Sequence, residues 1–148
     1  MKTATDSTDV PARPLRSIRV GEVMHEGVLT CGRDESLAAV AQLMADHRVH
    51  SIVVTDEPSE TPSLWGVVSD LDLVAAASVR DLEEQVAGAA AATPAILIAP
   101  ADTLQRAAQL MVEHALAHLV VVRAERPVGV ISTLDIAAAL AGRTAAVL

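Results

Sequence analysis

The sequence predicts a mixed α/β (α+β) fold in which two pseudo-symmetric β-α-β-β-α repeats pack as one module. Three observations predict it: an internal repeat, a helical spacing of apolar residues in each copy, and two runs rich in Val and Ile after each helix. Hydrophobic residues make up 51% of the 148 positions, which is enough to fill a core. Because a unit of roughly 50 residues rarely holds a core alone, we expect the two copies to share one.

The first half of the repeat aligns without a gap. Residues 27–54 match residues 94–121 at a constant shift of 67 positions. This shift places Leu37 on Leu104. The neighbouring apolar positions of both segments then recur at steps of three and four, which indicates one amphipathic helix in each copy.

The second half of the repeat follows a surface loop. The stretch GVVSDLD at residues 66–72 matches GVISTLD at residues 129–135, now at a shift of 63. The second copy has therefore lost four residues. The extra residues of the first copy lie in the Pro-, Ser- and Glu-containing stretch 56–63, which is typical of an exposed turn.

Each copy predicts the same order of elements. A short extended run comes first, at residues 28–31 and 95–98, and the amphipathic helix follows. Two strands come next, and their nearly continuous Val and Ile residues indicate strands that are covered on both faces. An Ala-rich helix closes each copy, at residues 70–77 and 133–141.

These elements divide the chain into five segments. We expect a flexible N-terminal tail, a first repeat, a linker that opens with a short helix, a second repeat and a C-terminal tail, at residues 1–19, 20–78, 79–92, 93–142 and 143–148. The start of the chain lacks the apolar stretch of a signal peptide, and no apolar run is long enough to span a membrane.

Residues 20–142 resemble a pair of CBS domains, often called a Bateman module. The resemblance rests on the tandem unit, on the run HRVHSIVV that leads into a strand, and on the paired GVVSDLD and GVISTLD motifs. It implies a module that binds adenosine nucleotides (AMP, ADP or ATP) or related adenosyl ligands in two clefts between the repeats.

The resemblance also implies polar ligand contacts. The ribose-binding acid of the family corresponds to Asp72 and Asp135. The phosphate-facing hydroxyl corresponds to Ser69 and Ser132. In some members a histidine faces the phosphates, and His50 stands at that position here.

The adenine slot is implied to be apolar. Val67 and Val130, which follow the strand glycines, correspond to its lining residues. Each cleft also borrows Val49 or Leu116 from the other repeat. The second copy departs from the pattern at Ala117, which occupies the place of the phosphate-facing histidine.

The residues themselves allow two interpretations of each Ser-x-x-Asp pattern. Ser69 and Asp72 stand where a strand turns into a helix, and the unpaired N–H groups of a helix start attract phosphate. The Asp carboxylate would then turn outward and accept hydrogen bonds from two ribose hydroxyls. The same pattern is also a capping box, in which the acid bonds to the backbone of its own helix.

The two copies differ in charge beside the expected phosphate position. The first copy has Asp70 there and the second has Thr133. Because Asp70 would repel a phosphate, we expect the Ser132/Asp135 cleft to bind a multiply charged ligand more readily. A protonated His50 would offset part of this repulsion in the first cleft.

Other reactive residues indicate no further chemistry. Four histidines could in principle hold zinc, but their spacings differ and no cysteine accompanies them, so we expect strand-entry and helix-end roles and no metal site at His47, His50, His114 and His118. Cys31 is expected to be a buried apolar residue. Trp65 is expected to pack locally, with cover by a partner chain as the alternative.

Composition limits the function. The net charge of −8 and the single aromatic residue argue against nucleic-acid binding, and no catalytic motif is present, so we expect a non-enzyme. We therefore predict a cytoplasmic adenine-nucleotide sensor that requires no cofactor, forms a homodimer through the Ala-rich faces 75–77 and 137–141, and signals to an effector protein without a membrane. The alternatives are a ligand-free interaction module and a binder of S-adenosylmethionine or a metal ion.

Overall fold

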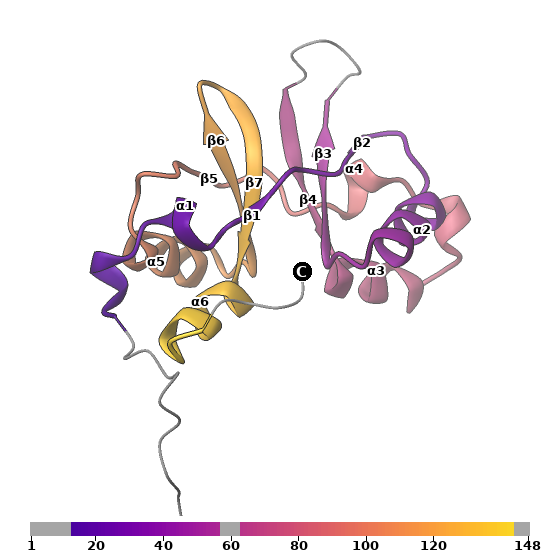
Figure 1. Cartoon of the computed structure of the whole chain (residues 1–148). Helices are drawn as coiled ribbons and strands as arrows, with labels where there is room; N and C mark the ends of the chain where they lie inside the picture. The colour runs from indigo at the N-terminus through magenta and orange to yellow at the C-terminus, as the bar shows by residue number, and fades with distance from the viewer. Residues whose placement is uncertain (1–12, 57–62, 144–148) are drawn as a thin grey trace, which may run out of the picture.

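Each repeat folds around its own small sheet in the computed structural model, which describes residues 13–56 and 63–143 (Figure 1). The first sheet has the strand order β2-β3-β4, in which β2 (Thr30–Gly32) is parallel to β3 (Ser51–Thr55). β4 (Leu64–Ser69) runs antiparallel to β3. The helices α2 (Leu37–His47) and α3 (Asp70–Ala77) complete this repeat.

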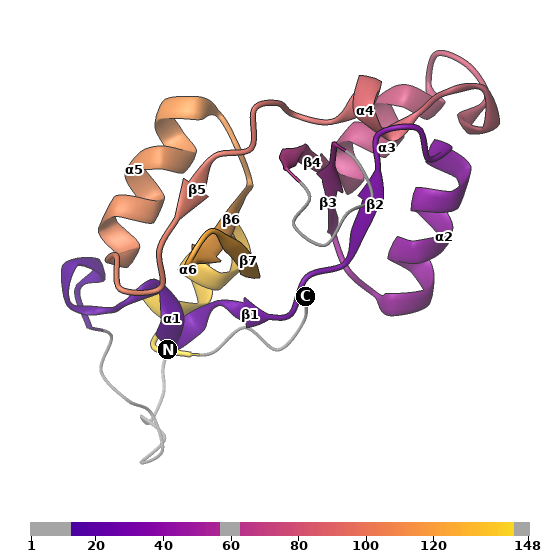
Figure 2. The same ribbon diagram turned by 90° about the horizontal axis from the view of Figure 1, so that it is seen from above.

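The second repeat has the same plan with one strand added at the edge of its sheet. Its strand order is β1-β7-β6-β5. Its elements are β5 (Leu97–Ile98), α5 (Leu104–His114), β6 (His118–Arg123), β7 (Arg126–Ser132) and α6 (Thr133–Leu140), with β1 (His25–Glu26) contributed from the N-terminal side. Seen from above, the two repeats lie side by side with α2 and α5 on the outer flanks (Figure 2). The predicted β-α-β-β-α order is confirmed in both copies.

The two amphipathic helices have the same ends, which explains their equal lengths. α2 begins after Ser36 and α5 begins after Thr103, and each hydroxyl accepts a hydrogen bond from the backbone N–H three residues later. Both helices end at a left-handed residue, Arg48 or Ala115, each with φ of 54°. The two copies therefore share the capping geometry that begins and ends this helix, as well as its apolar pattern.

The buried residues form three clusters. One lies within the first repeat, between its sheet and α2, and includes Leu37 and Ile52. A second lies within the second repeat and includes Leu104. A small third cluster joins the facing sheets and consists of Val53, Val67 and Val120. The expected shared core is thus only this small cluster, because each repeat already buries most of its apolar side chains by itself.

Two segments outside the repeats, here called the crossing segments, complete the two cores. The segment before the first repeat packs on the second repeat, and the linker before the second repeat packs on the first. The N-terminal segment, with η1 (Leu15–Ser17) and α1 (Val20–Val23), packs on the second repeat. The linker, with η2 (Leu82–Glu84) and α4 (Ala87–Ala90), packs on the first.

The two crossing segments form equivalent hydrogen bonds, whose partners are related by the same shift of 67 positions as the repeats. The N–H of Leu104 donates to the carbonyl of Ile18, and the N–H of Leu37 donates to the carbonyl of Gln85. The pseudo-symmetry therefore extends into both crossing segments. The two repeats are held together because each one is covered by the crossing segment that leads into the other repeat.

The motif glycines allow these crossing segments to approach the sheets. A Cβ on Gly129 would lie 2.4 Å from the carbonyl oxygen of His25 in β1. A Cβ on Gly66 would lie 2.2 Å from the carbonyl oxygen of Ala92 in the linker. The glycine of each GVVS or GVIS motif is thus required by backbone contact.

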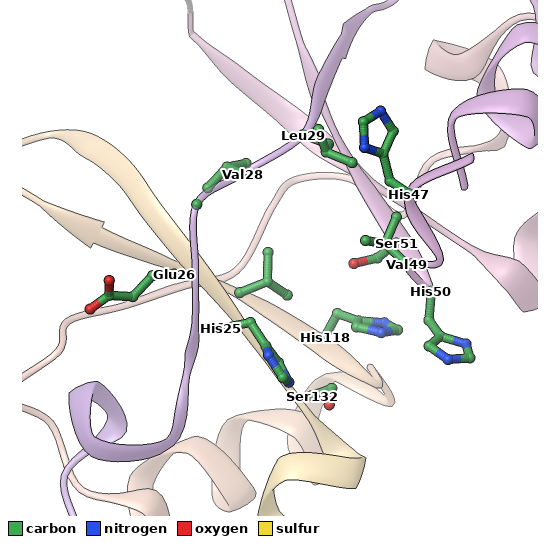
Figure 3. A pocket seen from close by; sticks show the side chains of 12 residues that line it. His25, Glu26, Val28, Leu29, His47, Val49, His50, Ser51, His118 and Ser132 are labelled. Carbon is green, nitrogen blue, oxygen red and sulfur yellow. The ribbon is translucent and has the colours of Figure 1, made fainter. Parts of the chain in front are cut away.

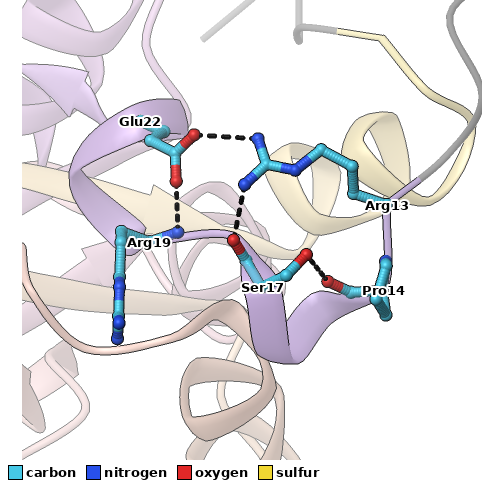
Figure 4. Close-up of polar contacts among 5 residues, drawn as sticks. All are labelled: Arg13, Pro14, Ser17, Arg19 and Glu22. Atoms are coloured by element: carbon cyan, nitrogen blue, oxygen red, sulfur yellow. Dashed lines mark hydrogen bonds and ion pairs between the residues drawn. The ribbon is translucent and has the colours of Figure 1, made fainter.

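Residues 13–19, which were expected to belong to a flexible tail, pack against the second repeat. Glu22 accepts a hydrogen bond from the N–H of Arg19 and pairs with Arg13, whose guanidinium also donates to the carbonyl of Ser17 (Figure 4). Ile18 is 5% exposed in the second core, and this burial anchors the segment. Residues 1–12 and 144–148, which belong to the expected tails, lie outside the described residues.

Candidate functional site

The two Ser-x-x-Asp patterns form capping boxes at the starts of α3 and α6. Ser69 caps α3, and the N–H of Ser69 donates to Asp72 Oδ2 over 2.8 Å while the hydroxyl of Ser69 accepts from the N–H of Asp72. Ser132 and Asp135 repeat this geometry with the same distance of 2.8 Å. Both carboxylates therefore turn back onto their own helix starts and do not turn outward, so the capping interpretation of these bonds is confirmed.

Asp135 is further covered by a histidine that the sequence did not single out. His25 Nε2 lies 2.7 Å from Asp135 Oδ1, and the Asp135 side chain is 0% exposed. Although the two atoms are close, neither has a well-formed hydrogen bond among the described residues. An ion pair or a weak polar contact results, depending on whether the imidazole is protonated.

The first repeat lacks this cover. The pairing of His25 with Val130 in the second repeat corresponds to the pairing of Ala92 with Val67 in the first. Because Ala92 has no side chain that could reach the acid, Asp72 remains partly exposed. The two ribose-binding candidates thus differ in environment, although their capping bonds are the same.

One cavity of about 430 Å³ opens between the repeats (Figure 3). Four of the residues expected at a ligand line it: Val49 and His50 from the first repeat, with Val130 and Ser132 from the second. Its other lining residues come from β1, from the segment after β1, from the end of α2, and from the starts of β3 and β6. The structure thereby brings together half-sites from the two repeats, as the resemblance implied.

The residues expected to form the other cleft do not meet in this cavity. Val67 is 7% exposed and packs between the two sheets, and Leu116 packs against the core of the second repeat. Asp72 borders a separate groove, which α3 forms with η2 and α4. Contact of Val67, Ser69, Asp72 and Leu116 with a ligand stays a prediction.

Two further histidines occupy the region where α3 and α6 begin. His50 Nδ1 lies 2.9 Å from Asp70 Oδ2, and this hydrogen bond lowers the pKa of the Asp70 carboxyl. Burial lowers the pKa of His118, and nearby His50 lowers it further, whereas Asp70 is the largest influence in the opposite direction. A second, smaller cavity at this place includes His50, Asp70, His118 and Thr133. Asp70 and Thr133 therefore share one region, which the sequence had placed in separate clefts.

The histidines do not form a metal centre in the part of the chain that the structure describes. Within residues 13–56 and 63–143, no group of three or more His, Cys, Asp or Glu side chains is placed to hold a metal ion. In the same residues, no helix is long and apolar enough to cross a bilayer.

Comparison with protein families identifies both repeats. The family model of the CBS domain matches residues 20–79 and 86–142. The chain belongs to the CBS domain family. It is a tandem CBS pair, with a mixed α+β fold, as the resemblance implied.

This CBS pair has relatives in mycobacteria and archaea. It is 28% identical over 118 residues to Hypoxic response protein 1 of Mycobacterium tuberculosis, covering 78% of this chain and 80% of that protein. It is 26% identical over 125 residues to an uncharacterized protein of Methanopyrus kandleri, covering 82% of this chain and 62% of that protein's length.

Solved structures share the fold. Hypoxic Response Protein I with two coordinated zinc ions matches with a TM-score of 0.65 and 26% identity, over 80% of this chain and 96% of that one. The CBS domain of a bacterial CNNM/CorC family Mg²⁺ transporter in complex with ATP matches with a TM-score of 0.72 and 17% identity, over 87% and 91%. The second likeness shows the fold alone.

The two other residues considered from the sequence have structural roles in the CBS pair. Cys31 is 8% exposed, and burial raises the pKa of its thiol to about 11. Trp65 donates its indole N–H to the carbonyl of Gly88 over 2.9 Å, and the Arg33 guanidinium lies 3.7 Å from the ring centroid. Trp65 therefore packs locally between the first repeat and the linker.

Sequence reasoning gave His25 and His118 only structural roles, at a strand entry or a helix end, and did not place them at the cavity. His25 lies in the segment before the aligned repeat, and the signal that could have found it is the match of residue 25 to residue 92 at the shift of 67. His118 aligns with Ser51 of the first copy. The comparison of the two copies therefore shows that this position differs between them, but it does not indicate a function. Both residues line the large cavity.

Proposed function

We propose that this CBS pair is a regulatory module that binds an adenine nucleotide in the cavity between its repeats. The observation that carries the proposal is the cavity of about 430 Å³ with Val49 and Val130 among its apolar lining residues and Ser132 at the start of α6. Its volume lies in the range of small-molecule sites. The complex of the CorC-family CBS domain with ATP supports the choice of ligand.

The roles follow from the cavity. Val49 and Val130 hold the adenine, and Ser132 and His50 face the phosphates, which also approach the N-terminal end of α6, where the helix dipole favours negative charge. For Asp135 to accept a ribose hydroxyl, the His25 side chain that covers it has to move aside. Binding would then change the contact between β1 and the second repeat.

The matching residues of the first motif are proposed as a second, weaker site. Ser69, Asp72 and Val67 have the same motif positions, with Leu116 borrowed from the other repeat. Asp70 adds a negative charge at the start of α3, which disfavours phosphate. Titration of AMP and ATP into Asp72→Ala and Asp135→Ala tests the difference, and equal losses of affinity from both variants contradict it.

Thermal unfolding with AMP, ADP, ATP, S-adenosylmethionine and Zn²⁺ tests the function. A ligand at 100 times its Kd should stabilise the fold by about 2.7 kcal/mol. Ser51→Trp places a large ring on a lining residue and should abolish the nucleotide effect. Gln42→Trp, on the exposed outer side of α2, should retain it.

Each result decides between functions. Stabilisation by a nucleotide that Ser51→Trp removes supports the proposal. If no nucleotide raises the unfolding temperature, the result favours a ligand-free interaction module. Stabilisation only by S-adenosylmethionine or by Zn²⁺ assigns the module to another ligand class, and for Zn²⁺ a chelator should reverse it.

We further propose that the module acts as a homodimer that passes the signal to an effector protein. α3 and α6 expose large apolar side chains: Leu71 is 72% exposed, Val74 65%, and Leu140 58%. Helices with such faces and Ala-rich flanks suit close pairing with a second copy. We expect a cytoplasmic role without catalysis, nucleic acid or membrane.

Light scattering after size exclusion tests the assembly. The wild-type protein should have twice the mass of the chain, and Leu71→Asp should shift it toward the monomer. Val112→Asp on α5, at a residue that is even more exposed than Leu71 and lies outside these helices, is the control and should leave the dimer intact. A monomeric wild type contradicts the proposal.

A further inference from the structure

The cavity between the repeats contains no permanent positive charge among its described lining residues. None of them is Lys or Arg. Its only side chains that can become cationic are the imidazoles of His25, His47, His50 and His118. Figure 3 shows His118 directed across the cavity between the other three, with His25 and Ser132 on one side and His50 on the other.

Two of these histidines stand at the junction of the two cavities. His50 and His118 line both the large cavity and the smaller one at the starts of α3 and α6. His50 is about half exposed and is already paired with Asp70. His118 is more enclosed, and burial lowers the pKa of its imidazole, so it is mainly neutral at pH 7 in the free protein.

The other charges that face this junction are negative. Asp70 at the start of α3 contacts His50, and Asp70, Asp135 and Asp72 all favour the protonated form of His118. From β1, Glu26 lines the large cavity beside His25, and His47 lines it from the end of α2. A phosphate that enters the cavity while its imidazoles are uncharged therefore meets carboxylates, and no Lys or Arg among the described lining residues.

We infer that phosphate binding in this cavity is coupled to proton uptake by the His50–His118 pair. A phosphate close to both imidazoles stabilises their charged forms, and His118, neutral in the free protein, takes up the proton. His118 is thereby a specificity-determining residue for the phosphorylated ligand. This inference rests on the proposed function and adds a regulation to it, because affinity becomes a function of pH.

The sign and size of the effect follow from linkage. Because the complex holds more protons than its free partners, the affinity for the nucleotide rises as the pH falls. The change is up to roughly tenfold per pH unit for each proton taken up. Phosphate itself gains a proton near pH 6, which works in the opposite direction, so the clearest range lies above about pH 6.5. Adenosine has no phosphate and should bind with an affinity that depends little on pH.

Isothermal titration calorimetry of ATP and adenosine at pH 6.5, 7.25 and 8.0, with EDTA present, tests the inference. Two buffers of different ionisation enthalpy at each pH give the number of protons taken up by the wild-type protein, which requires no variant. The comparison then uses His118→Asn, His50→Asn and the control His114→Asn, whose side chain is exposed on α5.

The expected result is that ATP affinity falls with rising pH, adenosine affinity does not, and His118→Asn loses both the pH dependence and most of the proton uptake. His114→Asn should behave like the wild type. If ATP binds with the same affinity at all three pH values and without proton uptake, this inference is overturned while the proposed function stands. If neither ATP nor adenosine binds, the proposed function fails and the inference fails with it.

Discussion

Substitution of the motif glycines Gly66 and Gly129 tests most sharply whether the crossing segments lie directly on the sheets. In Gly129→Ala the new Cβ would lie 2.4 Å from the His25 carbonyl oxygen and 3.2 Å from the sulfur of Met24, so β1 has to move away from β7. The movement strains or breaks the pairing of His25 with Val130 and of Glu26 with Gly129. Overpacking of this kind costs about 1–3 kcal/mol of the free energy of unfolding.

A matched pair of variants separates this contact from the general effect of a methyl group. Gly66→Ala should cost a similar amount, because its Cβ would lie 2.2 Å from the Ala92 carbonyl oxygen. Gly32→Ala, on β2, meets nothing within 4 Å and has no positive φ. It should be neutral or stabilise the fold by about 0.4–1 kcal/mol, through the unfolded state.

Urea unfolding followed by circular dichroism measures the three free energies. The expected order of midpoints has Gly32→Ala at or above the wild type, and Gly66→Ala and Gly129→Ala clearly below it. Equal midpoints for Gly129→Ala and Gly32→Ala would refute the claim that the N-terminal segment lies on the second repeat at this distance.

Three further predictions concern single side chains. Asp135→Ala should lower the free energy of unfolding by about 1–2 kcal/mol more than Asp72→Ala in urea titrations, because it also leaves His25 without its carboxylate, and equal losses would contradict this. Burial lowers the pKa of His118, so the stability of the fold is not reduced by this residue above its ordinary pKa of 6.5 and is reduced as the pH falls below that value. The melting temperature should therefore drop less between pH 7.5 and 5.5 in His118→Asn than in the wild type. Parallel curves of melting temperature against pH for the two proteins would argue against this. Cys31, with a pKa of about 11, should react with a thiol reagent at pH 7.5 only after unfolding, and rapid labelling of the native protein would show that the thiol is accessible.

Periodicity and duplication account for what the sequence could predict. The steps of three and four at Leu37, Val40 and Met44 give a helix whose predicted face is buried, and the Val runs give strands that are covered on both sides. The helix expected at residues 70–77 has those bounds in the structure. These features depend on local patterns, and local patterns are visible in one sequence.

The exchange of segments and the chemistry of the cavity depend on contacts between distant residues. Nothing local at Ile18 indicates that it is buried against the second repeat. The apolar side chains of α4 are all alanines, which are too small to mark this helix as part of the first core. His25 reaches Asp135 across 110 positions of the chain, so no spacing could connect them. The resemblance implied that Val49 borders the cleft of Val130 and Ser132, but the sequence placed His50 in the first cleft and gave no reason to expect His118 in this cavity.

The central claim is that an adenine nucleotide occupies the cavity between the two CBS repeats. Titration of ¹⁵N-labelled protein with ATP, followed by amide NMR shifts, tests it most directly. The account predicts saturable shifts concentrated at Val49, His50, Val130 and Ser132, with His25 affected as β1 responds. Spectra that do not change at millimolar ATP, or shifts confined to the outer faces of α2 and α5, would contradict it.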